Sequence, residues 1–314
     1  MGSMKRLKVG VVGVGHLGQH HARIYAQMPG VELVGVVDIN ERRAKEIGLK
    51  LKVPYYTEAS AIYGKVKAVS IAVPTISHYS LAQGFLDRKV DVLIEKPVAS
   101  NPEEAEDLIR TASSNECVLQ IGHVERFNNG FKVLQGLVKD PKFIECHRLG
   151  SFVERGTDVD VVLDLMIHDI DIVLSLERSP LKDLSAVGIP VLSQHVDIAN
   201  ARLQFESGCV ANITASRVSM EKMRRIRIFQ EDAYLALNYA TQEISSYKRE
   251  KSGHLSPFGL PHIGKEEIRV EKGEPLQDEL ESFINCVRGR GTPLISGEEG
   301  KKALIVACQI KDRF

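Results

Sequence analysis

One stretch near the start of the chain limits the possible folds more than any other. The apolar run Leu7–Val12 predicts a buried strand, and it leads into Gly13-Val14-Gly15-His16-Leu17-Gly18 and then into a run compatible with a helix. The spacing G-x-G-x-x-G in a strand–turn–helix unit is typical of dinucleotide binding. The first glycine permits the tight turn, the second lets a pyrophosphate approach the backbone, and the third allows helix and strand to pack closely.

The acidic residue after the next strand supports this interpretation. A second apolar run, Val31–Val37, ends at Asp38, whose carboxylate can accept hydrogen bonds from a ribose 2′-hydroxyl and would repel a 2′-phosphate. The sequence therefore predicts an NAD site in which the first N–H groups of the helix face the phosphates. The alternative is a tight turn without a ligand, which gives no reason for Gly15 or for Asp38.

Length and composition exclude several classes of protein. A chain of 314 residues favours two domains, because single cores seldom grow that large. Its 41 basic and 41 acidic residues balance, which argues against a nucleic-acid or membrane-surface partner, and no apolar run is long enough to span a bilayer. The five cysteines are scattered and never form C-x-x-C, so we expect reduced thiols in a cytoplasmic protein. Residues 1–3 look like a remnant of cloning, and the N-terminus lacks an apolar core of the signal type.

The first third of the chain alternates strands and helices. Apolar, β-branched runs at residues 66–73, 90–94 and 118–121 predict further strands, and Asn101-Pro102 followed by two glutamates predicts the start of a helix. This alternation is typical of a doubly wound parallel sheet, a Rossmann α/β domain, which we place at residues 1–124. Ligands of such sheets bind beyond the carboxyl ends of the strands, where residues 13–18, 74–78 and 95–97 should meet with Asp38 and His123. At this edge we expect cofactor contacts from Gly13, Gly15, His16, Leu17, Gly18, Asp38, Pro74, Thr75, His78, Glu95 and Lys96.

The pattern changes after about Glu125. A long apolar helix at residues 161–176 precedes strand-like segments without intervening helices, at residues 185–191, 198–205, 210–216, 225–229, 234–237 and 243–248. We therefore predict an α+β domain with a largely antiparallel open sheet at residues 125–314, whose free face favours a homo-oligomer, a dimer or tetramer. Residues 252–265, rich in Gly, Pro and His, predict a loop, and two helices close the chain, the second with a capping-box pattern from Ser296.

Lys96 is the first candidate for chemistry. It follows a buried strand at the predicted cofactor edge, and Pro97 blocks regular continuation of that strand. A fixed positive charge there can stabilise negative charge that develops on a reacting oxygen during hydride transfer. The alternative is a surface lysine paired with Glu95, which position alone leaves open.

The helix at residues 161–176 carries the second group of candidates. It is apolar almost all round, which predicts burial, yet Asp164, His168 and Asp171 share one face at spacings i, i+4 and i+7. Buried carboxylates are costly unless they are paired or open to a cleft. Three interpretations of this stripe are open: a satisfied structural network, a metal pair or a general base. We predict no metal site, because no further ligands are suitably spaced. As a base, His168 takes a hydroxyl proton and a carboxylate orients its ring.

Arginines give two weaker signals. Arg126 lies just beyond the last strand of the first domain and makes either a salt bridge at the hinge or a substrate contact. Arg224, Arg225 and Arg227 form a basic cluster near a predicted strand, which is either a solvated face or an anion site.

Together these motifs resemble the glucose–fructose oxidoreductase/inositol dehydrogenase (Gfo/Idh/MocA) family of two-domain NAD(P) enzymes. The resemblance covers the chain from Lys5 and rests on the glycine turn, Ala72-Val73-Pro74-Thr75 with His78, Glu95-Lys96-Pro97, and Asp164-x-x-x-His168 with Asp171. It implies that Lys96 and His168 flank the hydroxyl that is oxidised beside the nicotinamide, with Asp164 binding or orienting. It leaves open whether the lysine or the histidine is the base. The implied substrate contacts are Lys96, Arg126, Asn128, Asp164 and His168.

The chain departs from the family pattern around the expected pocket. Val161, Val162 and Met166 stand where the family often has glycines, and Thr75 replaces the usual Asn. The same helix and residues 122–128 look most like a subgroup acting on nucleotide sugars, which implies oxidation at C3 of a UDP-sugar such as UDP-N-acetylglucosamine, in the amino-sugar route to the lipid A of lipopolysaccharide. The family also includes dehydrogenases of free sugars and inositol. The competing class is a non-catalytic NAD-binding sensor or partner protein, which would need none of the catalytic candidates.

Overall fold

The structure, a computed structural model, describes residues 6–152, 159–249 and 263–314. The expected cloning remnant at residues 1–3 lies outside these ranges. The chain divides into a first unit, Met1–His123 with Leu276–Leu304, and a second unit, Val124–Pro275 with Ile305–Phe314. The first boundary lies one residue from the expected one, but residues 276–304, which were expected in the second domain, belong to the first unit.

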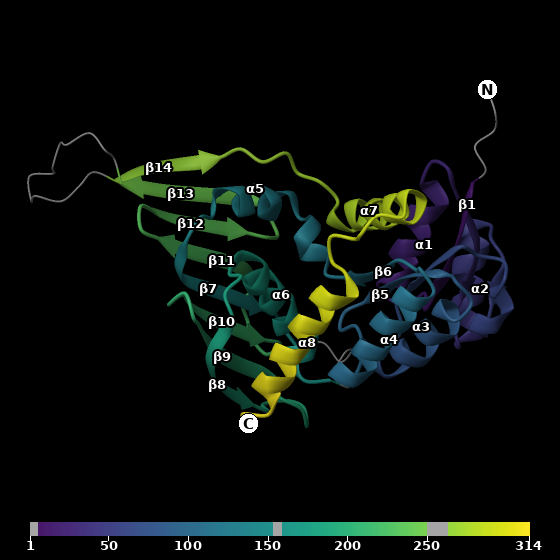
Figure 1. The fold of residues 1–314 in the computed structure, drawn as a ribbon, viewed down its shortest axis with the longest axis horizontal. Coiled ribbons are helices and arrows are strands. Elements are labelled where there is room, and N and C mark those ends of the chain that lie inside the picture. The colour runs from purple at the N-terminus through teal and green to yellow at the C-terminus, as the bar shows by residue number, and fades with distance from the viewer. Residues whose placement is uncertain (1–5, 153–158, 250–262) are drawn as a thin grey trace, which may run out of the picture. The chain divides into compact units, whose positions relative to one another are not determined.

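The first unit is built on a six-stranded parallel sheet with the strand order β3-β2-β1-β4-β5-β6 (Figure 1). The strand order runs outward in one direction from β1 to β3 and in the other from β4 to β6, which is the doubly wound topology. The predicted Rossmann sheet is therefore confirmed. Its elements are β1 (Leu7–Val12), α1 (Gly18–Gln27), β2 (Val31–Val37), α2 (Glu41–Leu51), β3 (Tyr55–Tyr56), η1 (Ala59–Ile62), β4 (Ala68–Ile71), η2 (Thr75–Ser77), α3 (His78–Leu86), β5 (Asp91–Glu95), α4 (Pro102–Ser114), β6 (Leu119–Gly122), α7 (Pro275–Gly289) and the first part of α8 (Gly297–Lys311).

Local sequence explains where these helices begin. The Asn101 side chain accepts a hydrogen bond from the backbone N–H of Glu104 at 2.8 Å, and Pro102 occupies the first position of α4, where no N–H is needed. Asn40 caps α2 in the same way through the N–H of Arg43. These caps fix the helices directly after the strand ends, where the candidate residues lie.

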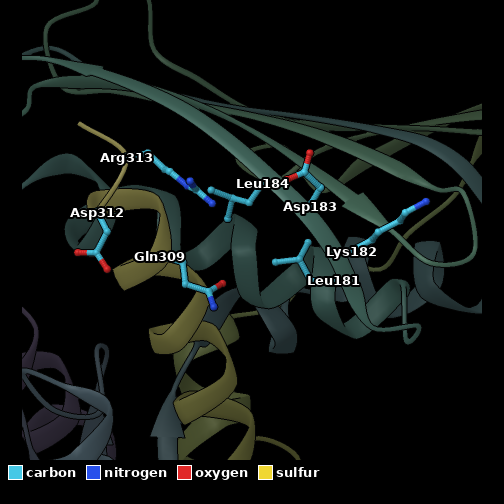
Figure 2. Close-up of a pocket in the computed structure, with 7 residues that line it drawn as sticks. All are labelled: Leu181, Lys182, Asp183, Leu184, Gln309, Asp312 and Arg313. Atoms are coloured by element: carbon cyan, nitrogen blue, oxygen red, sulfur yellow. The ribbon is translucent and has the colours of Figure 1, made fainter.

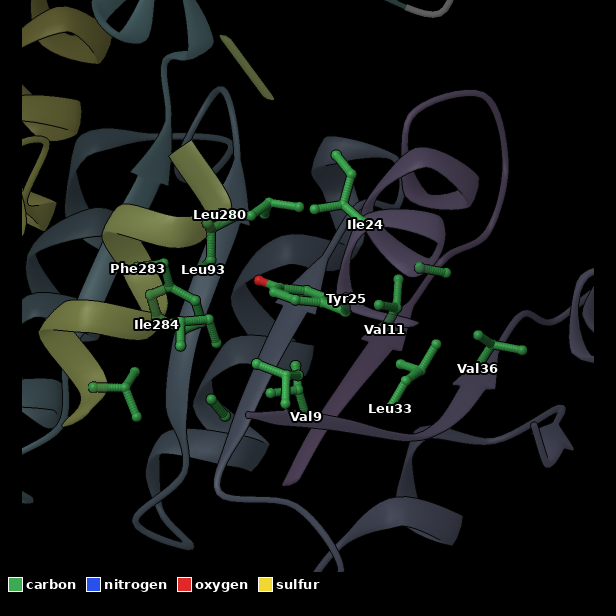
Figure 3. Packing of buried hydrophobic residues seen from close by; sticks show 14 of the residues in the cluster. Val9, Val11, Ile24, Tyr25, Leu33, Val36, Leu93, Leu280, Phe283 and Ile284 are labelled. Carbon is green, nitrogen blue, oxygen red and sulfur yellow. The ribbon is translucent and has the colours of Figure 1, made fainter. Parts of the chain in front are cut away.

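Helix α7 completes the core of the first unit. Figure 3 shows Tyr25 of α1 between the α7 side chains Leu280, Phe283 and Ile284 and the strand residues around Val11. All five are almost completely buried. The apolar stripe of α7 is clear in the sequence, but a stripe does not indicate which sheet it covers.

The second unit holds an eight-stranded sheet in the order β14-β13-β12-β11-β7-β10-β9-β8. β7 and β10 run parallel and the other neighbouring pairs run antiparallel, which confirms the predicted largely antiparallel sheet. Its elements are η3 (Val124–Phe127), α5 (Asn129–Leu137), β7 (Pro141–Leu149), η4 (Val162–Met166), α6 (Ile167–Leu176), β8 (Leu181–Ile189), β9 (Ile198–Phe205), β10 (Val210–Ser216), β11 (Met223–Gln230), β12 (Ala233–Asn238), β13 (Glu243–Arg249), β14 (Ile263–Ile268) and the end of α8.

Two strands of the second unit, β7 and β14, were not predicted as strands. β7 has no clear apolar alternation in the sequence, because its inward positions include the charged Arg148. The loop predicted at residues 252–265 lies outside the described residues as far as 262, and from Ile263 the chain forms β14 instead.

The sheet of the second unit has two different faces. Alternate residues of β7, such as Ile144 and Cys146, are buried on the face that α5 and α6 cover (Figure 1). The opposite face carries an aromatic row, in which the neighbouring rings of Phe143, Phe229, Tyr234 and Tyr247 lie 4.8–5.7 Å apart. Within the described ranges, no helix combines the length and the apolar character that a bilayer crossing needs.

Candidate active site

The glycine turn joins β1 to α1 at the carboxyl edge of the parallel sheet. Gly13 has a φ of +82°, and a Cβ atom there would lie 2.4 Å from the carbonyl oxygen of Ala72. A Cβ atom on Gly18 would lie 1.8 Å from the carbonyl oxygen of Gly13. Real Cβ atoms essentially never approach other atoms within 3.0 Å, so the fold itself requires glycine at both positions.

Gly15 differs from the other two glycines of the motif. A Cβ atom there would meet nothing within 4 Å among the described residues, and its φ lies outside the left-handed region. Neither packing nor backbone conformation therefore requires glycine at this position. The bare backbone fits the close approach of a pyrophosphate, which is the task of the middle glycine in dinucleotide sites.

Asp38 is attached to the same turn. Its Oδ2 atom accepts a hydrogen bond from the backbone N–H of Val14 at 2.9 Å, and Oδ1 accepts one from Asn40 at 2.9 Å. Arg43 donates from Nε to the carbonyl oxygen of Val14 at 2.8 Å. The carboxylate predicted to bind the ribose is thus held beside the glycine turn by backbone contacts.

Exposed apolar side chains gather at this edge, which the sequence analysis did not predict. Ile39 after β2 is 95% exposed, Ile76 after β4 is 83% exposed, and Leu17 in the glycine turn is 43% exposed. Single exposed apolar residues are ordinary, but these three follow adjacent strands of one sheet. They offer apolar contacts to the flat rings of a dinucleotide.

His78 lies at the ends of two strands. Its ring is buried, with Nδ1 2.7 Å from the carbonyl oxygen of Pro97 and Nε2 2.9 Å from that of Val73. Burial lowers the pKa of His78, against the opposite effect of the two carbonyl groups. The imidazole therefore ties the segment after β4 to the segment after β5, while Pro74 stays exposed and Thr75 half-buried beside it.

Lys96 stands between two anchored neighbours. Glu95, at the end of β5, places Oε1 3.1 Å from Nε2 of His21, so its partner is a histidine of α1. The carbonyl oxygen of Pro97 contacts His78, as described above, and the Lys96–Pro97 peptide bond is cis. The half-buried Lys96 therefore lies between two residues with buried contacts, the Glu95 side chain and the Pro97 carbonyl group.

The second group of candidates lies on an interrupted helix. Residues Val162–Met166 form a π-helical segment, η4, and α6 continues from Ile167. Asp160 caps the segment by accepting hydrogen bonds from the N–H groups of Val162 and Leu163 at 3.0 Å each. Asp164 and His168 are half-buried on it. π-Helical turns are rare and occur often at functional sites, because they displace side chains from the regular helical positions.

The expected polar stripe on this helix is divided between two environments. Asp171 is buried and pairs with Arg126, with Oδ1 3.3 Å from the guanidinium NH1. For Arg126, the structure thus contains the salt bridge that was one of the two alternatives. Asp164 and His168 lack the deep burial of Asp171, so the three residues do not share one environment.

A buried ion-pair network that was not predicted joins α6 to β7. Arg148 of β7 contacts both carboxylate oxygens of Asp169, at 2.8 and 3.0 Å, and Oε1 of Glu125 at 2.9 Å. Burial alone would lower the pKa of Arg148, but the two carboxylates raise it. The partners are more than 20 positions apart in the chain, so only the sheet brings them together.

The remaining candidates make structural contacts. Asn128 is buried at the start of α5, where its side-chain oxygen accepts hydrogen bonds from Gly130 and Phe131. Arg227 of the basic cluster pairs with Glu145 on the neighbouring strand at 2.9 Å, on the face of the sheet opposite α6.

Two further observations concern ligands. In the three described ranges, no group of three or more His, Cys, Asp or Glu side chains is arranged to hold a metal ion. A pocket of ≈ 340 Å³ in the second unit lies between β8 and the end of α8 (Figure 2). It contains none of the predicted site residues and is lined by Leu181, Lys182, Asp183, Leu184, Gln309, Asp312 and Arg313.

Two family models match the chain. Residues 7–123 match the model described as "Oxidoreductase family, NAD-binding Rossmann fold", and residues 136–236 match "GFO/IDH/MocA C-terminal domain". The first match falls within the first unit and the second within the second unit.

Similar proteins extend over almost the whole chain. A UDP-N-acetylglucosamine 3-dehydrogenase from Acidithiobacillus ferrooxidans is 36% identical over 309 residues, which are 98% of this chain and 97% of that protein. A solved structure of this dehydrogenase from the same organism has a TM-score of 0.91 at 34% identity, covering 98% of this chain and 97% of the other. A myo-inositol 2-dehydrogenase from Thermotoga maritima is 25% identical over 97% of this chain and 95% of its own length. A scyllo-inositol dehydrogenase from Lactobacillus casei, solved with NAD(H) and scyllo-inositol, shares the fold with a TM-score of 0.80 at 18% identity, covering 99% of this chain and 97% of the other.

Proposed function

Because the chain belongs to the Gfo/Idh/MocA family of NAD-binding oxidoreductases, we propose that it oxidises the C3 hydroxyl of UDP-N-acetylglucosamine to a ketone, with NAD as oxidant. One observation carries the choice of substrate: the relative named for this reaction is 36% identical over 98% of the chain, and so matches both units. A myo-inositol dehydrogenase matches a similar length at 25% identity, which makes inositol or a free sugar the second candidate.

The glycine turn and Asp38 would hold NAD in this proposal. The open backbone at Gly15 supports the fit of the pyrophosphate, and the fixed Asp38 carboxylate supports recognition of an unphosphorylated ribose. When bound, NAD supplies the ring that accepts the hydride from the substrate carbon. Pro74, Thr75 and the apolar Ile76 would border the same edge of the sheet.

Lys96 and His168 carry the proton chemistry in this proposal. Oxidation of a secondary alcohol removes one hydride and one proton, so the chain must supply a group that takes the hydroxyl proton. A ring nitrogen of His168 takes it, Lys96 donates a hydrogen bond to the hydroxyl oxygen and stabilises the charge that develops there, and Asp164 orients the imidazole or the sugar. Two further candidates are buried near these elements. Arg126 pairs with Asp171 on the helix that carries His168, and Asn128 caps the start of α5.

A substrate panel tests the proposal directly. Purified protein with NAD is offered UDP-N-acetylglucosamine, UDP-glucose, N-acetylglucosamine, glucose and myo-inositol, and NADH formation is followed by absorbance. We expect the highest kcat/KM with UDP-N-acetylglucosamine, and product analysis should place the ketone at C3. A preference for myo-inositol would show that inositol, and not UDP-N-acetylglucosamine, is the substrate. NAD binding without turnover of any compound would favour the non-catalytic sensor class.

Single variants test the two catalytic assignments. Lys96→Met and His168→Asn should each lower turnover by on the order of a hundredfold or more, while the dissociation constant of NAD stays near the wild-type value. The exposed Lys67 and His195 offer matched controls, and Lys67→Met and His195→Asn should keep full activity. Wild-type turnover in Lys96→Met or His168→Asn would remove that residue from the mechanism.

Oligomeric state, location and pathway belong to the same proposal. On the second sheet, the face opposite α5 and α6 carries the partly or fully exposed aromatic row Phe143, Phe229, Tyr234 and Tyr247, which favours self-association through this face. The five free cysteines favour a cytoplasmic location. Because a transaminase with an amino donor can convert a C3 ketone to an amine, we also propose a role in supplying 3-amino sugars for lipid A. In sedimentation experiments the wild type should be an oligomer, and Phe229→Asp should dissociate into smaller species.

A further inference from the structure

A buried hydrogen bond joins the helix after the glycine turn to the strand that carries Lys96. His21 lies one turn into α1, and its Nε2 atom is 3.1 Å from Oε1 of Glu95 at the end of β5. The His21 side chain is completely buried, and that of Glu95 is 10% exposed. The glycine motif ends at Gly18, so dinucleotide binding by this motif does not explain the presence of His21.

The Glu95 carboxylate is also confined by β6. A Cβ atom on Gly122 would lie 3.0 Å from Oε2 of Glu95, which is tighter than ordinary contacts. A larger residue on β6 would therefore push the carboxylate away from its place. The pairing with His21 and the contact with Gly122 leave Glu95 little freedom to move.

A second carboxyl group approaches from α7. Glu279 is fully buried, and in the described part of the chain neither of its carboxylate oxygens has a hydrogen-bond partner. Burial raises the pKa of Glu279 well above its ordinary value, and the negative charge of Glu95 raises it further. Burial also acts to raise the pKa of Glu95, but His21, Lys96 and His78 together lower it. These opposite shifts favour the charged form of Glu95 and the neutral form of Glu279.

We propose that His21 is a positioning residue for Lys96, which acts through Glu95 to couple the cofactor-binding helix to the strand end that bears the lysine. The inference rests on the proposed role of Lys96 in the oxidation. Residues on both sides of Lys96 are anchored, Glu95 through its side-chain carboxylate by His21 and Pro97 through its backbone carbonyl by His78. Loss of the His21 contact frees one anchor and leaves a buried carboxylate without its partner.

Substitutions at His21 separate positioning from stability. In His21→Gln the side-chain amide can still donate to Glu95, whereas in His21→Leu nothing can. We expect His21→Leu to lower kcat by roughly tenfold to a hundredfold, as small misplacements of catalytic groups do, without a change in the dissociation constant of NAD measured by calorimetry. His21→Gln should restore most of the turnover.

Two matched variants protect this test from a folding defect. If His21→Leu fails to fold, His21→Leu combined with Glu95→Gln removes the uncompensated charge and should regain thermal stability but not turnover. Glu279→Gln replaces the neutral acid by a neutral amide, so it should keep wild-type kcat. Wild-type turnover in folded His21→Leu, or recovery of turnover together with stability in the double variant, would show that His21 serves stability alone and would overturn the proposal.

A readout without substrate distinguishes failure of this inference from failure of the proposed function. Labelling of lysine amines by trinitrobenzenesulfonate, followed by mass spectrometry, reports the surroundings of Lys96 directly. We expect the labelling rate of Lys96 to differ between wild type and His21→Leu, while that of the exposed Lys67 stays the same. An unchanged rate at Lys96 would refute the positioning role, whereas full turnover in Lys96→Met would refute the function and leave the labelling result standing.

Discussion

Gly15 provides the sharpest test of the cofactor site, because nothing within the described chain explains it. Gly15→Ala adds one methyl group where no atom lies within 4 Å, so the folded protein should accept it. The methyl carbon stands roughly 1.5 Å out from Cα, and a pyrophosphate in contact with the bare backbone would have to retreat by about that distance. A misplacement of about 1 Å can cost on the order of a hundredfold in rate at a catalytic site, and we expect a loss of similar order in NAD binding here.

The expected magnitudes separate binding from folding. For Gly15→Ala, the dissociation constant of NAD should rise by roughly tenfold to a hundredfold, or about 1.4–2.8 kcal/mol, while stability changes by no more than about 0.5 kcal/mol. Gly18→Ala presses a methyl group to 1.8 Å from a carbonyl oxygen. Overpacking of this kind costs about 1–3 kcal/mol or more, so this variant should lose stability first.

The assay combines NAD titration calorimetry with thermal melting of both variants. Gly136→Ala in α5 is the matched control, because a Cβ atom there also meets nothing within 4 Å of the described residues. It should bind NAD normally and gain roughly 0.5–1 kcal/mol of stability, since alanine favours a helix over glycine. Normal NAD affinity in Gly15→Ala would refute the reasoning that the open backbone is reserved for the dinucleotide.

Two further predictions concern single carboxylates. Asp38→Asn keeps the size of the side chain but removes its charge, so the preference of kcat/KM for NAD over NADP should fall by on the order of tenfold or more; an unchanged ratio would show that Asp38 does not exclude the 2′-phosphate. Burial alone would raise the pKa of Asp197, but hydrogen bonds from Ser193 and Val191 and the pairing with Arg217 lower it well below its ordinary value. A carboxylate of this kind stabilises the fold above its unfolded pKa of about 3.9 and loses that effect as the pH falls through the folded value. Asp197→Asn should therefore lower the melting temperature at pH 7 and reduce its fall in acid, and an equal deficit at pH 7 and pH 3 would contradict this.

Local patterns in the sequence were sufficient for most of the first unit. The predicted strand Val31–Val37 has the same limits in the structure, and the helix start predicted at Asn101-Pro102 is capped there by Asn101. These features depend on residues a few positions apart, so a single sequence carries the information. The parallel, doubly wound character of the sheet followed from the alternation of strands and helices.

Features that depend on distant residues could not be predicted. The His21–Glu95 hydrogen bond spans 74 positions, and nothing near either residue indicates the other. β7 could not be predicted because a charged residue normally indicates a position that faces solvent. That Arg148 faces inward becomes understandable only when its buried partners Glu125 and Asp169 are known. The π-helical turn at Val162–Met166 also has no signal in the apolar pattern, which suits a regular helix equally well.

The return of α7 to the first unit affects how the polypeptide acquires its shape on the ribosome. Tyr25 emerges early, but its neighbours Phe283 and Ile284 are translated only after every strand of the second unit has been made. Until α7 has been translated, the side of the first unit that α7 covers stays exposed, and chaperones and proteases can reach it. A gene fragment that stops after residue 123 would encode a domain without this flank, and any recombination that exchanges the domain must carry residues 276–304 with it.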